Sequence, residues 1–285
     1  RIGYFSSDFY HHSVSILLTR VLELHDKSQF EIFAYSFSHI NDSYTKRIQD
    51  AVFCFRSVND LGDIDIVNLA RKDQLDIAID LNGYTQNNRM SIFLYRVAPI
   101  QINYLGYAGS LGSKSYDYIL ADKVLIPAEK QKFYTEKVLY FPNSYFPSGD
   151  EQYQLNKTFS REELGLPLDG FIFACFNRIE KITRKEFKIW MRLLQKVDQS
   201  VLWLIKPNDF AVKNIYLELT SYGIDQERII FAEIFGRNDH LARHSCADLF
   251  LDTFNCNSGT TATDVLSCGL PLITLIGESC SARIA

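Results

Sequence analysis

Short runs of β-branched and aromatic residues alternate with amphipathic helical stretches along the whole chain. Such alternation is typical of strand–helix–strand units, which place their strands in a parallel sheet. In the first half the predicted strands cover residues 2–5, 30–36, 77–81, 100–104 and 118–120, and predicted helices cover 14–23 and 64–72. The pattern therefore predicts an α/β protein.

The alternation stops near residues 141–149, where prolines, a glycine and small polar residues break both periodicities. We place a domain boundary there, dividing the chain into residues 1–145 and 146–285. Predicted strands then follow at 171–176, 201–205, 228–231, 249–252 and 272–275, with predicted helices at 186–196, 213–222, 239–245, 261–268 and 279–285. Two Rossmann-like, doubly wound domains facing a cleft are expected. We expect the second to be truncated at its C-terminus, because its last predicted helix has no cap.

Composition and charge exclude several classes of protein. The 285 residues are 47% hydrophobic and 22% charged with a net charge of -4, which is typical of a soluble globular protein. No basic field favours nucleic acid or an anionic membrane, and the apolar runs fall far short of the roughly 20 residues of a membrane-spanning helix. The six cysteines form no CxxC pair and no secretory signal opens the chain. We therefore expect free thiols and a cytoplasmic location.

The segment 252–271 contains the strongest binding signal. A predicted strand ends at Asp252, a loop of small residues follows, and a helix is predicted from Thr261. Free N–H groups at that helix start, beside the hydroxyls of Thr260 and Thr261, form a site for a phosphate or diphosphate. Asp264, placed in the first turn, either compensates the helix dipole or binds ribose hydroxyls. An ordinary capped helix explains the same residues.

Two further groups of cations lie at predicted element ends. Lys181 and Arg178 follow the strand 171–176, and a cation there can neutralise a departing diphosphate, although a solvated loop lysine is the alternative. Arg237, His240 and Arg243 open another predicted helix. His240 and Arg243, three residues apart, share a helix face and can hold a base and a phosphate, although a surface histidine fits equally.

The capping residues and possible metal ligands are assigned from their positions. Asn238 or Asp239 is the expected cap of the helix that contains His240. Asp63 and Asp65 have the form of a metal-binding DxD motif, but they begin a predicted helix, where capping is expected. The paired histidines at positions 11 and 12 have no acidic or cysteine ligand at matching spacing, so we expect no metal site.

Polar and glycine-rich loops also follow the strands of the first half. His12 follows the strand 2–5 and can act as a general base, because the ordinary pKa of histidine lies near neutrality. Gly109 and Gly112 belong to a glycine-rich loop where the backbone can approach a sugar closely. These strand-end loops lie on one side of each half, as an enzyme with a cleft requires.

These segments resemble the catalytic region of protein O-GlcNAc transferases, glycosyltransferase family 41, a family with bacterial and plant O-fucosyltransferase-like relatives. The resemblance covers essentially all 285 residues in order and spacing. It rests on Gly3 to Phe9 with His12, Asn82 to Thr85, Ala98 to Gln101, Leu105 to Tyr107, Asp117 to Ile119, Pro127 to Glu129, Phe176 and Asn177, Lys181, Val201 to Leu204, Arg228 to Phe231, His240, Leu251 to Thr253, and Thr260 and Thr261 with Asp264.

The resemblance implies a GT-B fold and an inverting transfer of a sugar, GlcNAc from UDP-GlcNAc, to Ser or Thr hydroxyls of proteins. It implies no metal or other cofactor, and N-terminal tetratricopeptide (TPR) repeats that present acceptors. By position, Lys181 would neutralise the leaving diphosphate, Thr260 and Thr261 would bind its oxygens, and Asp264 would hold the ribose. The remaining assignments are His240 on the nucleobase with Arg243 nearby, His12 as candidate base on the acceptor side, and Gly109 to Gly112 at the sugar.

Two departures from the family pattern bear on the donor. Gly259 stands where animal O-GlcNAc transferases have histidine, as in the plant O-fucosyltransferase relatives, and Arg178 replaces a glutamine. GDP-fucose or another hexose donor is therefore an alternative to UDP-GlcNAc. A sugar-nucleotide-binding scaffold without catalysis is a second alternative, against which the presence of both Lys181 and His12 argues.

Overall fold

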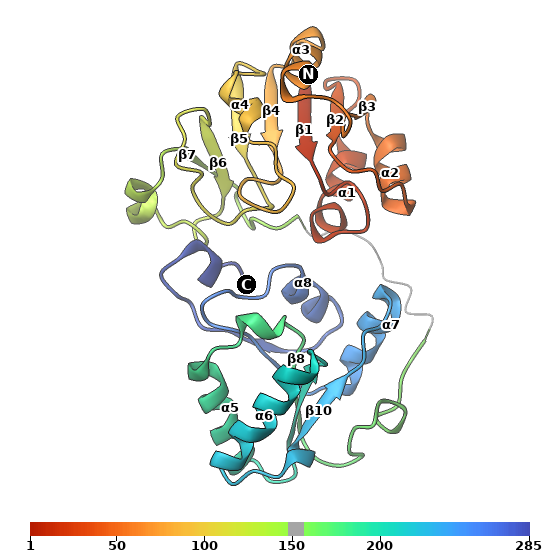
Figure 1. The fold of residues 1–285 in the computed structure, drawn as a ribbon, viewed down its shortest axis with the longest axis vertical. Helices are drawn as coiled ribbons and strands as arrows, with labels where there is room; N and C mark the ends of the chain where they lie inside the picture. Colours follow the sequence, from red (N-terminus) through yellow and green to blue (C-terminus); the bar gives the residue numbers. More distant parts are fainter. Residues whose placement is uncertain (148–156) are drawn as a thin grey trace. The chain divides into compact units, whose positions relative to one another are not determined.

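The computed structural model describes residues 1–147 and 157–285, which form two compact units, Arg1–Asp150 and Glu151–Ala285 (Figure 1). The contacts divide the chain after Asp150, whereas the sequence pattern places the boundary after residue 145. Residues 148 and 149 of the predicted break lie outside the described residues. Each unit has its own parallel sheet.

The first unit is built on a seven-stranded parallel sheet in the order β3-β2-β1-β4-β5-β6-β7 within the part of the chain that the structure describes. Its elements are β1 (Ile2–Ser6), α1 (Ser13–Leu24), β2 (Ile32–Ser36), α2 (Ser43–Ala51), β3 (Cys54–Ser57), α3 (Asp63–Lys72), β4 (Ile77–Asp80), α4 (Ser91–Leu94), β5 (Ile100–Asn103), β6 (Tyr118–Ala121) and β7 (Lys137–Tyr140). The strand order reverses beside β1, so the loops after β1 and β4 leave the sheet next to each other, where such folds bind ligands.

The second unit repeats this plan with five described strands in the order β10-β9-β8-β11-β12. Its elements are β8 (Ile172–Cys175), α5 (Arg184–Lys196), β9 (Val201–Ile205), α6 (Asp209–Ser221), β10 (Ile229–Ala232), α7 (Arg237–Ala242), β11 (Leu249–Leu251), α8 (Thr260–Ser267) and β12 (Leu272–Ile273). Here the order reverses between β8 and β11. The loops that follow these two strands are therefore neighbours.

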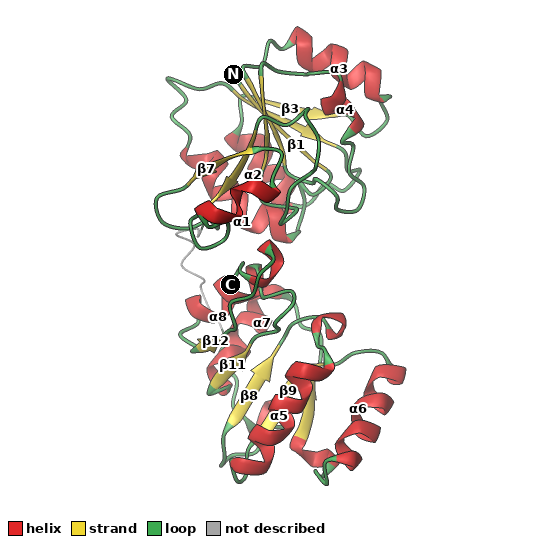
Figure 2. Cartoon of the chain, turned by 90° about the vertical axis from the view of Figure 1, so that its left-hand side faces the viewer, coloured by secondary structure: helices red, strands yellow, loops and turns green. Residues whose placement is uncertain are grey.

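Helices cover both faces of each sheet, as Figure 2 shows for the second unit. Along β8, Phe173 and Cys175 belong to one hydrophobic cluster and Ile172 and Ala174 to another. This alternation follows from the two-residue period of a strand, which sends successive side chains to opposite faces. A strand buried on both sides reads as a continuous apolar run, which is why the sequence pattern located β8 and β9 closely.

Several predicted elements differ from the observed ones. The helix predicted at 279–285 is wrong: only a 3-10 turn forms, at Cys280–Ala282. The backbone there bonds to other loops, with Asn257 N donating to Ser281 O and Gly277 N to Ala282 O, both at 2.8 Å. The pattern also missed α2, β3 and β7. In the described ranges no helix is long and apolar enough to cross a membrane.

Candidate functional site

Lys181 lies against the loop that leads into α8. It ends a 3-10 turn, Ile179–Lys181, that follows β8, and its Nζ donates a hydrogen bond to the backbone carbonyl of Asn257 at 3.0 Å. Because β8 and β11 are adjacent in the sheet, their two loops meet at one edge. The structure thus brings together Lys181 and the segment before Thr260, which sequence analysis treated as separate signals.

A single buried carboxylate holds this loop in place. Asp252, which is 1% exposed, follows β11, and its Oδ1 accepts bonds from the backbone N–H groups of Thr253 and Ser258, from Ser258 Oγ and from Asn177 Nδ2, at 2.7–3.0 Å. Its Oδ2 accepts from Thr274 Oγ1 at 2.7 Å. Sequence analysis gave Asp252 no role, although its place directly after a buried strand was a usable signal.

The N-terminus of α8 offers unused donors. The helix begins at Thr260 after Gly259, which provides no side-chain cap. Among the described residues, the backbone N–H groups and hydroxyls of Thr260 and Thr261 donate to no partner. Four such donors at the positive end of a helix fit the oxygens of a phosphate.

A pocket of about 410 Å³ adjoins Lys181, and it is lined by Arg178, Glu180, Lys181, Thr183, Asn255 and Cys256. The side chain of Arg178 is 83% exposed, and its Nε lies 3.5 Å from the exposed carboxylate of Glu180. An exposed pair of this kind contributes little to stability, so Arg178 is available to another anion.

Asp264 is paired with Arg237. The guanidinium nitrogens of Arg237 lie 2.8 and 3.1 Å from the two carboxylate oxygens, and both side chains are largely buried. Burial raises the pKa of Asp264, and the bonds from Arg237 oppose that rise. Asp264 lies in the second turn of α8, so its predicted place in the first turn was wrong. Each oxygen keeps a lone pair that can accept a ribose hydroxyl.

His240 is a half-buried residue of α7 with a defined tautomer. Its Nδ1 receives a hydrogen bond from Arg243 Nη2, and a guanidinium can only donate, so Nδ1 has no proton. Burial, followed by the charge of Arg243, lowers the pKa of His240 to about 3, so the neutral ring has its proton on Nε2. The ring is therefore half-buried and held by Arg243, which distinguishes it from a freely exposed surface histidine. The predicted caps Asn238 and Asp239 were wrong, because α7 begins after Gly236.

Arg243 is a core residue rather than a phosphate ligand. Its side chain is 1% exposed, lies 4.6 Å over the Phe176 ring and donates from Nη1 to the carbonyl of Glu233 at 2.6 Å. Sequence analysis missed its neighbour His244, which is fully buried and donates from Nδ1 to the carbonyl of His240 at 2.7 Å. Burial lowers the pKa of His244 to about 4. The predicted shared face of His240 and Arg243 is confirmed, with Arg243 orienting the histidine.

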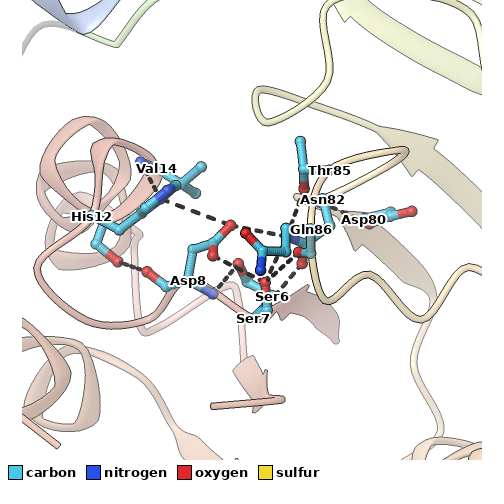
Figure 3. A network of polar contacts seen from close by, with 10 residues as sticks. Ser6, Ser7, Asp8, His12, Val14, Asp80, Asn82, Thr85 and Gln86 are labelled. Carbon is cyan, nitrogen blue, oxygen red and sulfur yellow. Dashed lines mark hydrogen bonds and ion pairs between the residues drawn. The ribbon is translucent and has the colours of Figure 1, made fainter. Parts of the chain in front are cut away.

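The first unit has a second polar cluster, at the ends of β1 and β4 (Figure 3). His12 is the N-cap of α1, and its Nδ1 accepts from Val14 N at 3.3 Å and lies 3.8 Å from Asp8 Oδ2. Asn82, after β4, donates to Asp8 Oδ2 at 2.9 Å and to Ser7 Oγ at 2.8 Å. Sequence analysis proposed His12 but gave no role to Asp8 or Asn82, whose contact depends on the strand order.

The glycine loop of the first unit is fixed by side chains from neighbouring segments. Asn103 Nδ2 donates to the carbonyl of Gly109 at 3.0 Å, and the buried carboxylate of Glu136 accepts from Leu111 N and Ser110 Oγ, both at 2.6 Å. Gly112 has φ +63°, in the left-handed region that favours glycine. The loop thus presents a defined backbone surface at Gly109 and Gly112.

Asp63 and Asp65 do not act as helix caps. The N-cap of α3 is Gly62, and the Asp63 carboxylate instead accepts hydrogen bonds from Arg89 and Ser91. The expected capping role was therefore wrong. Within residues 1–147 and 157–285, no three His, Cys, Asp or Glu side chains are grouped so that they could hold a metal ion.

Each unit is an α/β domain of Rossmann type, and in the second unit Lys181 contacts the loop that leads to the unused donors at the start of α8. The model of Glycosyl transferase family 41 matches residues 1–161 and 147–285, so this chain belongs to glycosyltransferase family 41. The predicted GT-B class of fold is confirmed.

Curated relatives and solved structures agree with this assignment. The chain is 35% identical to the probable UDP-N-acetylglucosamine–peptide N-acetylglucosaminyltransferase SEC of Arabidopsis thaliana, over 100% of the chain and 30% of the relative. It is 30% identical to the similarly named SPINDLY protein of Solanum lycopersicum, over 97% of the chain and 30% of the relative. The structure of a point mutant of the Thermobaculum terrenum O-GlcNAc transferase matches with a TM-score of 0.91 and 28% identity, over 100% of this chain and 54% of the other. The chain thus spans 30% of the length of the Arabidopsis and Solanum relatives.

Proposed function

We propose that the complete protein transfers N-acetylglucosamine from UDP-GlcNAc to Ser or Thr hydroxyls of proteins, with inversion at the anomeric carbon. The observation that carries this proposal is the hydrogen bond from Lys181 to Asn257, in the loop that leads to the unused donors of Thr260 and Thr261. A diphosphate that leaves the sugar gains negative charge, and these groups can stabilise it from fixed positions. The names of the relatives supply the donor and the peptide acceptor.

The proposed roles follow from the contacts. Lys181 neutralises the departing diphosphate while Thr260 and Thr261 bind its oxygens, and Arg178 adds a second positive charge at the pocket. Asp264, held in place by Arg237, accepts the ribose hydroxyls. His240 contacts the nucleobase, with its Nε2 proton available to a carbonyl oxygen.

On the acceptor side, the hydroxyl oxygen attacks the anomeric carbon, its proton passes to a base, and the electron pair of the breaking C–O bond stays with the diphosphate. We assign His12 as that base. Gly109 and Gly112 contact the sugar, because a backbone without side chains permits close approach.

No metal or cofactor is needed in this scheme. Lys181 and the N-terminus of α8 supply the positive charge that a divalent cation supplies in other transferases. Undiminished transfer in excess EDTA is the expected result, and activity that needs added Mn²⁺ or Mg²⁺ would contradict it.

We also propose a cytoplasmic location and TPR repeats in the rest of the protein that present the acceptor. The free thiols of Cys54, Cys175 and Cys246 support a reducing compartment. The relatives are about three times the length of this chain, which leaves room for such repeats.

A second donor is favoured by one observation. Gly259, directly before Thr260, offers no side chain to the sugar or phosphate, so GDP-fucose or another hexose donor is the second candidate. Transfer by the complete protein from UDP-GlcNAc, UDP-glucose and GDP-fucose, measured side by side on one acceptor, tests the proposal. We expect UDP-GlcNAc to give the highest kcat/KM. A preference for GDP-fucose would replace the donor, and no transfer from any of the three would refute catalysis.

A further inference from the structure

The His12 ring lies between two groups that need opposite protonation of the same nitrogen (Figure 3). Val14 N–H donates to Nδ1 at 3.3 Å, which requires a lone pair on that atom. Asp8 Oδ2 lies 3.8 Å from the same Nδ1, and a carboxylate can only accept, which requires a proton there. The first distance is long for a hydrogen bond and the second is too long for one. The ring therefore satisfies neither partner fully.

The choice of partner decides what the other ring nitrogen can do. When Nδ1 caps α1, the neutral ring has its proton on Nε2, which can then donate but cannot accept a proton. When Nδ1–H points to Asp8, Nε2 has the lone pair that a general base needs. Catalytic hydrogen bonds are often long without substrate and shorten when it binds. A movement of about 1 Å would bring Nδ1 within hydrogen-bond distance of Asp8.

Asp8 is held in place to accept a hydrogen bond from Nδ1–H. It is 7% exposed, Ser7 Oγ donates to its Oδ1 at 2.9 Å, and Asn82 Nδ2 donates to its Oδ2 at 2.9 Å. The Ser15 hydroxyl donates to the Asp8 backbone carbonyl at 2.6 Å and not to the carboxylate, so it does not orient the carboxylate oxygens. Among the described residues, Asp8 is the one charged side chain with an ion-pair contact to His12, and the Tyr10 ring lies near the imidazole, with centroids 5.8 Å apart.

The helix can release the histidine ring without losing its start. Ile16 N donates to the backbone carbonyl of His12 at 2.9 Å, and this bond does not involve the ring. One side-chain cap is lost when the ring turns. A charge-assisted bond to Asp8 offsets that loss.

We propose that Asp8 is a positioning residue that switches His12 from helix cap to general base. This rests on the proposed function. With Nδ1–H bonded to Asp8, Nε2 takes the proton of the Ser or Thr hydroxyl as its oxygen bonds to the anomeric carbon and the nucleotide diphosphate departs with the electron pair of the broken bond. The imidazolium so formed is stabilised by the Asp8 carboxylate, as in other His–Asp pairs.

Two substitutions of Asp8 separate positioning from structure. In Asp8→Asn the amide can donate to Nδ1 and hold the capping tautomer, whereas Asp8→Ala leaves His12 free. If Asp8 were purely structural, Asp8→Ala would lower kcat more than Asp8→Asn, because asparagine preserves the shape of the side chain and alanine leaves a gap. We therefore expect kcat of Asp8→Asn to fall about 100-fold or more, at least as far as that of Asp8→Ala, although Asp8→Asn has the higher melting temperature.

Ser15→Ala and a double variant complete the test, which is run on the complete protein with UDP-GlcNAc and an acceptor peptide. Ser15→Ala removes a bond to the Asp8 backbone without touching the carboxylate and should leave kcat within about 3-fold. His12→Ala together with Asp8→Asn should be no slower than His12→Ala alone, because one group acts through the other. Near-normal kcat in Asp8→Asn, or losses of kcat that multiply in the double variant, would overturn the role of Asp8. Either result would leave the proposed function standing. Absence of transfer by the unmodified protein would overturn the proposed function and this inference together.

Discussion

Arg243 donates to Nδ1 of His240, and this one bond leaves the proton of the neutral imidazole on Nε2. No hydrogen-bond partner of that Nε2 occurs among the residues described, and the atom is not fully enclosed. A buried arginine thus decides which hydrogen-bonding group the His240 ring presents, in our proposal to a nucleobase.

Replacing Arg243 should weaken nucleotide binding without stopping the chemical step. Arg243→Lys retains the charge but loses the fork that reaches both His240 and the Glu233 carbonyl, so the ring is no longer held in one tautomer. We expect the Kd of UDP, measured by calorimetry, to rise about 10-fold, with kcat at saturating donor changed less than 3-fold. Lys206→Met, which removes the exposed ion-pair partner of Glu233, is the matched control and should leave the Kd unchanged.

Acid should destabilise the protein through its buried histidines. Burial lowers the pKa of His240 to about 3 and that of His244 to about 4, against 6.5 in an unfolded chain. Both groups are neutral in either state above about pH 6.5, where their contribution to stability is complete. Below pH 6.5 the two histidines bind protons in the unfolded chain but not in the folded protein. The free energy of unfolding therefore falls as the pH drops toward 4.

His244→Asn tests this directly, because an amide nitrogen can replace Nδ1 as donor to the His240 carbonyl and does not titrate. The melting temperature of the variant, followed from pH 7.5 to 4.5, should fall less steeply than that of the unmodified protein. Equal slopes would show that His244 already binds a proton in the folded state.

Removing the Lys181 side chain should slow the chemical step. Lys181→Ala takes one fixed positive charge from the leaving diphosphate, and losses of this kind lower kcat about 100-fold or more. Donor binding should weaken much less, because Thr260 and Thr261 remain. Lys188, exposed on α5, gives the control variant Lys188→Ala. Full turnover by Lys181→Ala would refute the assigned role.

A side chain at position 259 should change the choice of donor. Gly259→His places a hydrogen-bond donor directly before Thr260, and one hydrogen bond made or blocked is equivalent to about 1–3 kcal/mol. Relative kcat/KM for UDP-GlcNAc against GDP-fucose should therefore shift about 10-fold or more. Gly259→Ala, which adds volume without a polar group, separates the effect of the imidazole from that of its bulk. An equal shift in both variants would contradict a polar interaction of the imidazole with the donor.

The sequence located most strands and the positions where loops leave the sheets, because buried parallel strands read as apolar runs. The strand β7, with the residues of Lys137–Tyr140 mostly exposed, lacked that pattern and was missed. Side-chain pairs between residues far apart in the sequence could not be predicted either. The pairs Arg237–Asp264 and Asp8–Asn82 depend on tertiary contacts across 27 and 74 residues. The burial of Arg243 was equally hidden, since it depends on tertiary packing against Phe176 and on a bond to the Glu233 carbonyl.

The hydrogen bonds at Asp252 make the proposed anion site dependent on the fold of the whole second unit. One carboxylate gathers donors from the segments after β8, β11 and β12, and the loop it holds accepts the bond from Lys181. The site cannot assemble until these separate strands are paired. A nucleotide or inorganic diphosphate that binds there would therefore bind the folded unit alone, and would raise its melting temperature by mass action. Thermal shift with diphosphate would then report correct folding of the second unit, even in variants that no longer transfer sugar.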